Sequence, residues 1–271
     1  MKQLMPLIIF SLFNIYVCAQ ELNFRGARSL ALGSSSVALI DEWSFFNNPG
    51  ALAFIEKARI GINYSNQYSL IEFQQQDASV ILPFKKGVFS TGFSYSAFNA
   101  LSNWRTGLGY SMLLNDNISL GMQFNYFQKR FLQLGNDRKR VLTADIGFLY
   151  KITSNWNFGI CINDFLGFFV EEENRFSSVR LGSDISLSDK VNFLLEGYQS
   201  TFYSYQLRSG LEYEAIKSLF FRLGYKSNPN EITFGLGYNK SSFKLDIASS
   251  FHFVLGWSPS ISLSYAFDED K

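Results

Sequence analysis

The sequence predicts an all-β fold, a 14-stranded antiparallel transmembrane β-barrel with an N-terminal hatch segment in the lumen. The first observation is a period-two alternation of apolar and polar residues in the segments after residue 57, which is typical of strands with two different faces. The second is that short and long connections between these segments alternate along the chain. The third is that the charged residues fall on the polar face, which leaves the apolar face to contact lipid.

The composition fits such a barrel. Aromatic residues and charged residues each make up 17% of the 271 residues, whereas charged residues make up about a quarter of an average soluble chain. The mean hydropathy of +0.01 carries little information, because half of the residues in a membrane strand are polar. A water-soluble β-sandwich would show the same alternation with its polar face outward, so the connections and the charges have to decide between the two folds.

Residues 1–19 are predicted to be a secretory signal peptide. The apolar run Leu4–Val17 follows a positive charge and precedes small residues, which places the cleavage before Gln20. This run of about 14 residues is shorter than the roughly 20 that a transmembrane helix needs. Lipoprotein processing at Cys18 is the alternative. Cleavage would leave Cys161 as the only cysteine and a chain without net charge, which gives no indication of a nucleic-acid partner.

Residues 20–57 are predicted to form the hatch segment, and residues 58–271 the barrel. The hatch segment lacks period-two alternation, and its small residues and the turn at Asn48-Pro49-Gly50 indicate short helical turns and tight loops.

Fourteen strands are expected after it, most of them close to the length that a tilted membrane strand needs. The expected strands are Ala58–Asn66, Gln74–Phe84, Val88–Phe98, Trp104–Leu114, Ile118–Arg130, Arg140–Lys151, Trp156–Phe165, Phe176–Leu187, Val191–Thr201, Ser204–Glu214, Ser218–Ser227, Glu231–Lys240, Phe243–Phe251 and Ile261–Phe267, with a loop at His252–Ser260.

The connections support a barrel over a sandwich. Those at 85–87, 115–117, 153–155, 188–190 and 215–217 are short, and longer links lie between them, apart from a short one at 228–230. A barrel with tight periplasmic turns at one end and external loops at the other requires this alternation, whereas a sandwich does not.

The charges support the barrel as well, because a lipid-facing Arg or Lys at mid-bilayer costs about 2–4 kcal/mol. The confinement of the charged residues to one face predicts a bacterial outer-membrane location, with the lipid bilayer and the outer-membrane insertion machinery as partners. The charged residues expected to face the lumen are Arg59, Arg105, Asp145, Arg180, Asp184, Arg208, Glu212, Arg222, Lys226, Glu231, Lys244 and Asp246. A barrel of this size lies between those that their side chains fill and those with an open channel, so we expect ion pairs and the hatch to fill the lumen.

Motifs at the two ends of the chain carry a resemblance to a known family. The segments Arg25–Gly33, Val37–Leu39 and Trp43–Ala53, together with His252–Ser258 and Ile261–Leu263, resemble the hatch and the last strand of the PorV/PorQ-like branch of the FadL-type outer-membrane barrels. The resemblance implies one of two roles. One is FadL-like passage of a hydrophobic small molecule, with a lateral exit through the wall. The other is a non-transporting interaction barrel that serves a PorV-like, type IX secretion or envelope assembly.

For the transport role, the aromatic residues of the hatch are expected to line a pocket, with lumen arginines along a selectivity path. More often, such charges form ion pairs that seal a barrel. The candidate ligand-binding residues are Trp43, Phe45, Phe46, Asn48, Pro49, Arg105, Arg180 and Arg222.

An enzyme is not expected. His252 with Ser250 and Asp246 could form a hydrolase set, but no nucleophile elbow or oxyanion motif surrounds the serines. One His and one remaining Cys without clustered ligand spacing predict no metal site, and no cofactor motif is present.

Overall fold

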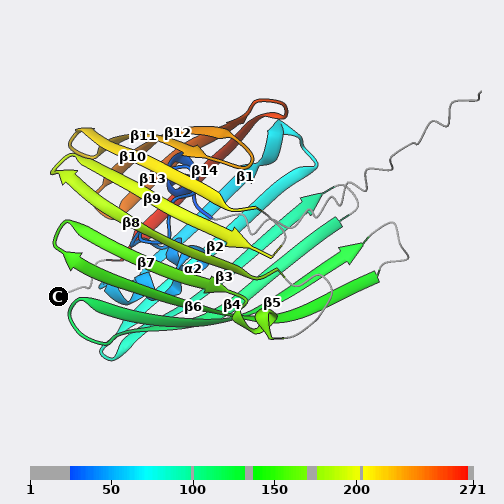
Figure 1. Ribbon diagram of the computed structural model, residues 1–271, viewed down its shortest axis with the longest axis horizontal. Helices are drawn as coiled ribbons and strands as arrows, with labels where there is room; N and C mark the ends of the chain where they lie inside the picture. The colour runs from blue at the N-terminus through cyan, green and yellow to red at the C-terminus, as the bar shows by residue number, and fades with distance from the viewer. Residues whose placement is uncertain (1–24, 99–100, 132–136, 170–175, 202–203, 268–271) are drawn as a thin grey trace, which may run out of the picture.

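The computed structural model describes residues 25–98, 101–131, 137–169, 176–201 and 204–267. Its strands pair antiparallel with their sequence neighbours, and β1 also pairs with β14, which closes the barrel. The predicted 14-stranded fold is therefore confirmed (Figure 1). The strands are β1 Arg59–Asn66, β2 Phe73–Phe84, β3 Gly87–Phe98, β4 Leu101–Leu113, β5 Ile118–Phe131, β6 Asp137–Thr153, β7 Trp156–Asn163, β8 Ser178–Ser188, β9 Val191–Ser200, β10 Gln206–Ile216, β11 Leu219–Lys226, β12 Glu231–Lys240, β13 Phe243–His252 and β14 Gly256–Ala266.

The expected loop at His252–Ser260 was wrong. Strand β13 extends to His252, and β14 begins at Gly256, so that Trp257 pairs with Phe251 and Pro259 with Ser249. The glycine and the proline suggested a loop, because both residues weaken strands. The alternation nevertheless continues through them, since Trp257 points outward and Ser260 is buried. The link between β3 and β4 is also shorter than expected, because β4 begins at Leu101.

The two faces of the wall differ as the alternation predicts. Large apolar side chains such as Ile62, Leu108 and Phe124 are 53–70% exposed on the outside. The charged residues of the inner face, such as Asp145 and Arg180, are buried. Within the described ranges, no helix is long and apolar enough to cross a membrane. An apolar exterior on a closed strand wall is the architecture of an outer-membrane barrel.

The two ends of the barrel are distinguished by their connections. Residues 85–86, 154–155, 189–190, 217–218 and 241–242 join strands at the end where β1 begins and β14 ends. We call this end the periplasmic rim, because tight turns mark that side in outer-membrane barrels. The opposite end, with the links at 67–72 and 164–177, is the outer rim.

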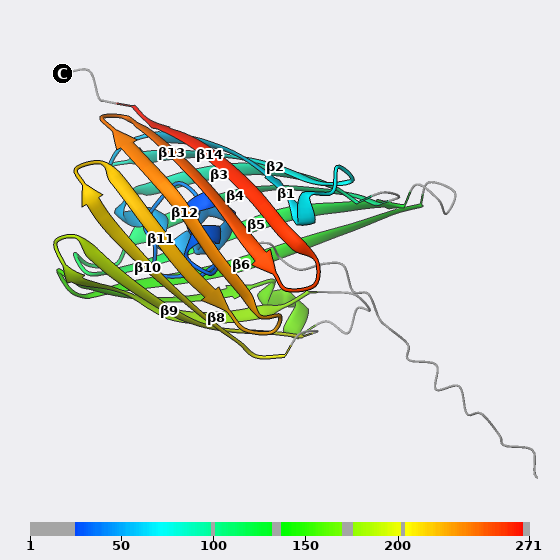
Figure 2. The same cartoon turned by 90° about the horizontal axis from the view of Figure 1, so that it is seen from above.

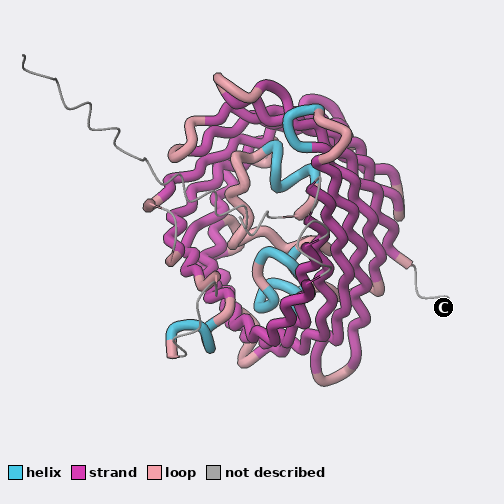
Figure 3. Tube along the Cα trace, turned by 90° about the vertical axis from the view of Figure 1, so that its right-hand side faces the viewer, coloured by secondary structure: helices cyan, strands magenta, loops and turns pink. Residues whose placement is uncertain are grey.

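The part of the N-terminal segment that the structure describes lies inside the barrel (Figures 2 and 3). It contains α1 (Ala27–Ala31), α2 (Ser44–Asn47) and the 3-10 helix η1 (Pro49–Phe54), as the sequence predicted. Helix α1 packs against β11 to β14, and η1 packs mainly against β4, β5 and β6. The predicted signal peptide lies outside the described residues, and the predicted domain bounds stay a prediction.

Candidate functional site

The N-terminal segment touches the wall where the inner face carries glycines. A Cβ built at Gly121 would overlap the backbone of Pro49 and Gly50, and one at Gly147 would overlap the Asn48 side chain and the backbone of Gly50. On the opposite side, a Cβ at Gly224 would overlap the backbone of Gly33. Backbone can approach backbone this closely only where a side chain is missing, so these glycines form a seat for the segment.

Residues Asn48 and Pro49 fix the segment to this seat. The Asn48 side chain accepts a hydrogen bond from Gly50 N at 3.0 Å and donates to the carbonyls of Val37 and Phe148 at 2.6 and 3.1 Å. The Pro49 carbonyl accepts a hydrogen bond from Ser111 Oγ at 2.6 Å. Both residues are therefore tied to the chain itself and hold η1 against the wall.

The three aromatic candidates form an apolar cluster in the periplasmic half of the lumen. Trp43, Phe45 and Phe46 are 1–3% exposed, and the rings of Phe45 and Phe46 meet edge to face with centroids 4.9 Å apart. They pack with wall residues Ile81 and Val88. A Cβ at Gly92 would overlap the Phe45 ring, so the ring lies directly against the wall at that position. The aromatic rings thus contact the barrel, and a role in ligand binding stays a prediction.

Arg180 lies at the centre of an ion-pair network on the β8 and β9 side. Its guanidinium binds both oxygens of Glu196 at 2.8 Å and donates to the Asn47 carbonyl at 2.6 Å. Glu196 also accepts hydrogen bonds from the backbone N–H groups of Ser36 and Val37 at 2.8 and 2.9 Å. Both charged side chains are fully buried. The pair therefore joins the wall to the N-terminal segment through charge-assisted hydrogen bonds.

Arg222 belongs to a second network, on β10 to β13. It contacts Glu212 at 2.5 Å and Asp246 at 2.6 Å. Arg28 of α1 binds the same Glu212 through two bonds of 3.0 and 2.7 Å and lies 3.5 Å from Asp41. Burial raises the pKa of Asp41, and the neighbouring Glu42 raises it further, against the attraction of Arg28.

Arg105 pairs with Asp145 at 3.0 Å, and its guanidinium lies 5.4 Å from the centroid of the Phe46 ring. The three candidate arginines therefore lie in three separate positions around the lumen, each with a carboxylate partner.

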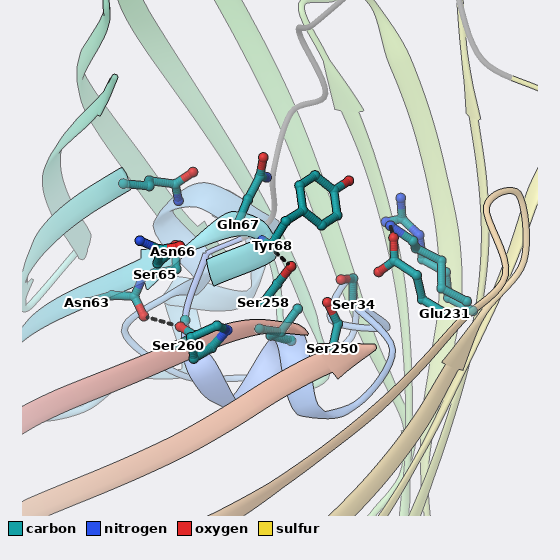
Figure 4. Close-up of a pocket in the computed structure, with 16 residues that line it drawn as sticks. Ser34, Asn63, Ser65, Asn66, Gln67, Tyr68, Glu231, Ser250, Ser258 and Ser260 are labelled. Atoms are coloured by element: carbon teal, nitrogen blue, oxygen red, sulfur yellow. Dashed lines mark hydrogen bonds and ion pairs between the residues drawn. The ribbon is translucent and has the colours of Figure 1, made fainter. Parts of the chain in front are cut away.

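Cavities remain on both sides of α1. The outer cavity opens toward the outer rim and has a volume of about 80 Å³ (Figure 4). Its lining is polar, and Figure 4 shows Tyr68 and Ser258 joined by a hydrogen bond, which Tyr68 N donates at 2.9 Å, and Ser260 bonded to Asn63 at 3.0 Å. Leu30 of α1 contributes to its floor.

Two inner cavities lie toward the periplasmic rim, with volumes of about 220 and 340 Å³, and Glu42 and Lys244 line both. Of the eight candidate ligand-binding residues, Trp43 and Arg222 line one of these two cavities.

Sequence reasoning did not identify the polar lining of the outer cavity or the role of Glu196. On β9, Glu196 shares the inward face with Leu194 and Tyr198, so the alternation of residues along this strand did not mark its inner face as polar.

His252 makes contacts that differ from those of a catalytic base. Its Nδ1 accepts hydrogen bonds from the backbone N–H groups of Val254 and Leu255, both at 3.2 Å. Asp246 is paired with Arg222. Among the described residues, no group of three His, Cys, Asp or Glu is placed to bind a metal ion.

Comparisons with known proteins agree with the fold. No protein-family model matches the chain, and no curated protein matches it. Among solved structures, it is similar to the Pseudomonas putida toluene transporter TodX, with a TM-score of 0.69 and 14% identity over 89% of this chain and 97% of that one.

It is also similar to a Pseudomonas aeruginosa FadL homologue, with a TM-score of 0.67 and 13% identity over 90% and 98% of the two chains. The Ralstonia pickettii toluene transporter TbuX gives a TM-score of 0.67 and 10% identity over 91% and 99%. At these identities the likeness concerns the fold, which is that of the FadL-type barrels.

This chain is an outer-membrane β-barrel protein. The closed strand wall and its apolar exterior require a bilayer, and the structural neighbours share the barrel over nearly their whole length. The structures named above are transport proteins or a FadL homologue, and they give no support to the alternative role in secretion.

Proposed function

We propose that this protein passes a hydrophobic small molecule across the outer membrane, with a lateral route through the barrel wall. The single observation that carries the proposal is the early end of β7. This strand ends at Asn163 after 8 residues, and although β1 and β11 are equally short, β7 ends where its neighbour β6 continues well beyond it. The neighbouring strand β6 extends outward to Asp137, but its ladder with β7 already ends at the pair of Ile146 and Ile162.

A short apolar helix takes the place of the strand at this position. The 3-10 helix η3 (Phe165–Phe168) follows β7 and contacts β6. Phe168 is 51% exposed and Phe169 is 82% exposed. A helix of one turn makes no ladder hydrogen bonds with β6, so separating the two costs less than separating paired strands. An apolar molecule could leave the lumen here and enter the bilayer.

The filled lumen also supports a lateral route over a straight one. Buried ion pairs and the N-terminal segment occupy the axis, and charged groups there would have to lose their partners before an apolar molecule could pass. The fold shared with toluene transporters suggests an aromatic hydrocarbon as the first molecule to test. Membership of the PorV/PorQ-like branch remains part of this proposal and is carried by the motifs of the two chain ends.

The test is uptake of labelled toluene by cells that make the protein in an outer membrane without another hydrocarbon channel. We expect faster uptake than in cells with an empty vector. Phe168→Gln with Phe169→Gln should reduce it, because a polar surface at η3 disfavours an apolar molecule. The control is Phe84→Gln, at a phenylalanine that is 60% exposed at the periplasmic rim, which should leave uptake unchanged. Uptake equal to that of the empty vector, with the barrel present in the membrane, contradicts the proposal.

A further inference from the structure

The outer cavity is bordered by an arc of small polar side chains on adjacent strands. Ser65 of β1 lies opposite Ser260 of β14, and Ser258 of β14 lies opposite Ser250 of β13. All four line the cavity, as Figure 4 shows, and are here called the serine row (Ser65, Ser250, Ser258 and Ser260). Gln75 of β2 extends the row, because it pairs with Ser65. Opposed side chains on neighbouring strands lie about 5 Å apart, so the row forms one polar surface.

The serine row has both donors and acceptors to spare. Ser258 Oγ accepts a hydrogen bond from a backbone N–H at 2.9 Å, which leaves its O–H group free to donate. Ser260 donates to Asn63 Oδ1 at 3.0 Å, which leaves its oxygen free to accept. Within the part of the chain that the structure describes, the hydroxyls of Ser65 and Ser250 bond to no other residue, although Ser250 is only 4% exposed.

A buried acceptor beside the row is also left over. Asn66 lines the same cavity, and its Oδ1 is buried without a hydrogen-bond partner among the described residues. Such an atom is costly to leave unpaired, so it favours a bound molecule that donates a hydrogen bond to it.

The charged residues of the lining already have partners. Lys226 and Glu231 form an ion pair at 3.2 Å, and Arg208 lies 3.3 Å from Glu196. A charged ligand would have to compete with these partners, and an apolar ligand would leave the serine hydroxyls unsatisfied. A neutral ligand that carries hydroxyl groups fits best, because each hydroxyl can both donate and accept.

The size and position of the cavity narrow the class of ligand further. Its volume of about 80 Å³ corresponds to about three molecules of liquid water, and it opens toward the outer rim. One edge of a sugar ring, with its hydroxyl groups, is of this size. We propose that the serine row binds the edge of a neutral sugar ring that enters the cavity from the outside. The inference does not rest on the proposed function, because β13, β14 and β1 lie across the barrel from β7.

The test is saturation-transfer NMR on the full chain in lipid nanodiscs, which avoids sugar-based detergents. The probes are D-glucose, D-galactose, D-mannose and maltotriose, with acetate and methylammonium as charged molecules. We expect saturation transfer to at least one of the sugars and none to the two ions. Tighter binding of maltotriose than of D-glucose would identify the ring as the end of a saccharide chain, and the reverse would identify it as a free sugar.

The variant S65A/S250A removes two hydroxyls of the serine row. It should weaken sugar binding by about 25-fold, which is about fivefold for each neutral hydrogen bond lost. The matched control is S79A/S90A, at two buried serines of β2 and β3 outside this cavity, whose hydroxyls have no partner among the described residues either. The control should bind sugar as the unchanged chain does. Migration of the unheated barrel in electrophoresis shows that each variant is folded.

Three results would overturn the proposal. They are the absence of transfer to every sugar, stronger transfer to acetate or methylammonium, and equal sugar binding by S65A/S250A and the unchanged chain. Toluene uptake by S65A/S250A should equal that of the unchanged chain, so a failure of sugar binding is distinguished from a failure of the lateral route.

Discussion

Two sides of the lumen hold the N-terminal segment by different physical means. Against β1 to β3, most of the contact is made by the aromatic cluster of Trp43, Phe45 and Phe46, beside one buried ion pair between Arg25 and Asp77 at 2.8 Å. Against β8 to β13, buried ion pairs such as Glu196 with Arg180 are added to the close backbone contact between Gly33 and Gly224. The smaller inner cavity lies along the second side.

The difference matters because the two kinds of contact respond differently to displacement. Apolar packing loses its contribution gradually as area is exposed, at about 25 cal/mol per Å². A buried ion pair is of little net benefit when intact, but it is very costly to break, because one charge is left without a partner in a dry environment. The ion-pair side therefore fixes the segment in one position, and the aromatic side contributes favourable apolar burial.

The largest effect is expected for Glu196→Gln. The substitution leaves one neutral amide oxygen where two carboxylate oxygens accepted hydrogen bonds from Arg180 and from the backbone N–H groups of Ser36 and Val37. Breaking a buried pair in this way costs about 3–5 kcal/mol. Guanidinium unfolding of the protein in lipid vesicles, followed by tryptophan fluorescence, measures the loss. The control is Glu214→Gln at the end of β10, near the periplasmic rim, which should change the unfolding free energy by less than about 1 kcal/mol. A loss for Glu196→Gln no larger than that for the control would show that the network does not hold the segment.

This network also marks the limit of what the sequence predicts. The alternation and the distribution of charges were enough to predict the barrel, its strand number and the inward position of residues such as Arg180 and Arg222. The partners were not predictable, because an inward position says nothing about which residue stands across the lumen. Glu196 was missed because its neighbours on the same face are apolar. The aromatic residues of the segment were expected at a pocket, and only the glycines opposite them, such as Gly92, could have indicated close packing against the wall.

An intermediate effect is expected for Gly147→Ala, which tests the seat of η1. The added methyl would overlap the side chain of Asn48 and the backbone of Gly50, and neither can move without breaking hydrogen bonds. Overpacking of this kind costs about 1–3 kcal/mol. The same unfolding experiment measures it. Gly197→Ala is the control, because its Cβ would meet only the ring of Tyr205, the end of a flexible side chain, and should cost much less. Equal losses for the two variants would mean that the seat contributes nothing specific.

The smallest effect is expected for Arg59→Gln, at the edge between the two sides. Arg59 lies 3.6 Å from Glu42, and its side chain is 23% exposed at the periplasmic rim. Water reaches the Arg59 guanidinium, and the buried Glu42 keeps Lys244 as a second cation nearby, so the loss of Arg59 should change the unfolding free energy by less than about 1 kcal/mol. Arg59 and Glu42 nevertheless line the larger inner cavity, so the variant should change the cavity's charge while leaving the segment in place. The conductance of small ions through the barrel in a planar bilayer measures this change of charge independently of the unfolding free energy. If Arg59→Gln destabilised the protein as much as Glu196→Gln does, partly exposed and fully buried charges would contribute alike, and the distinction between the two sides of the lumen would not hold.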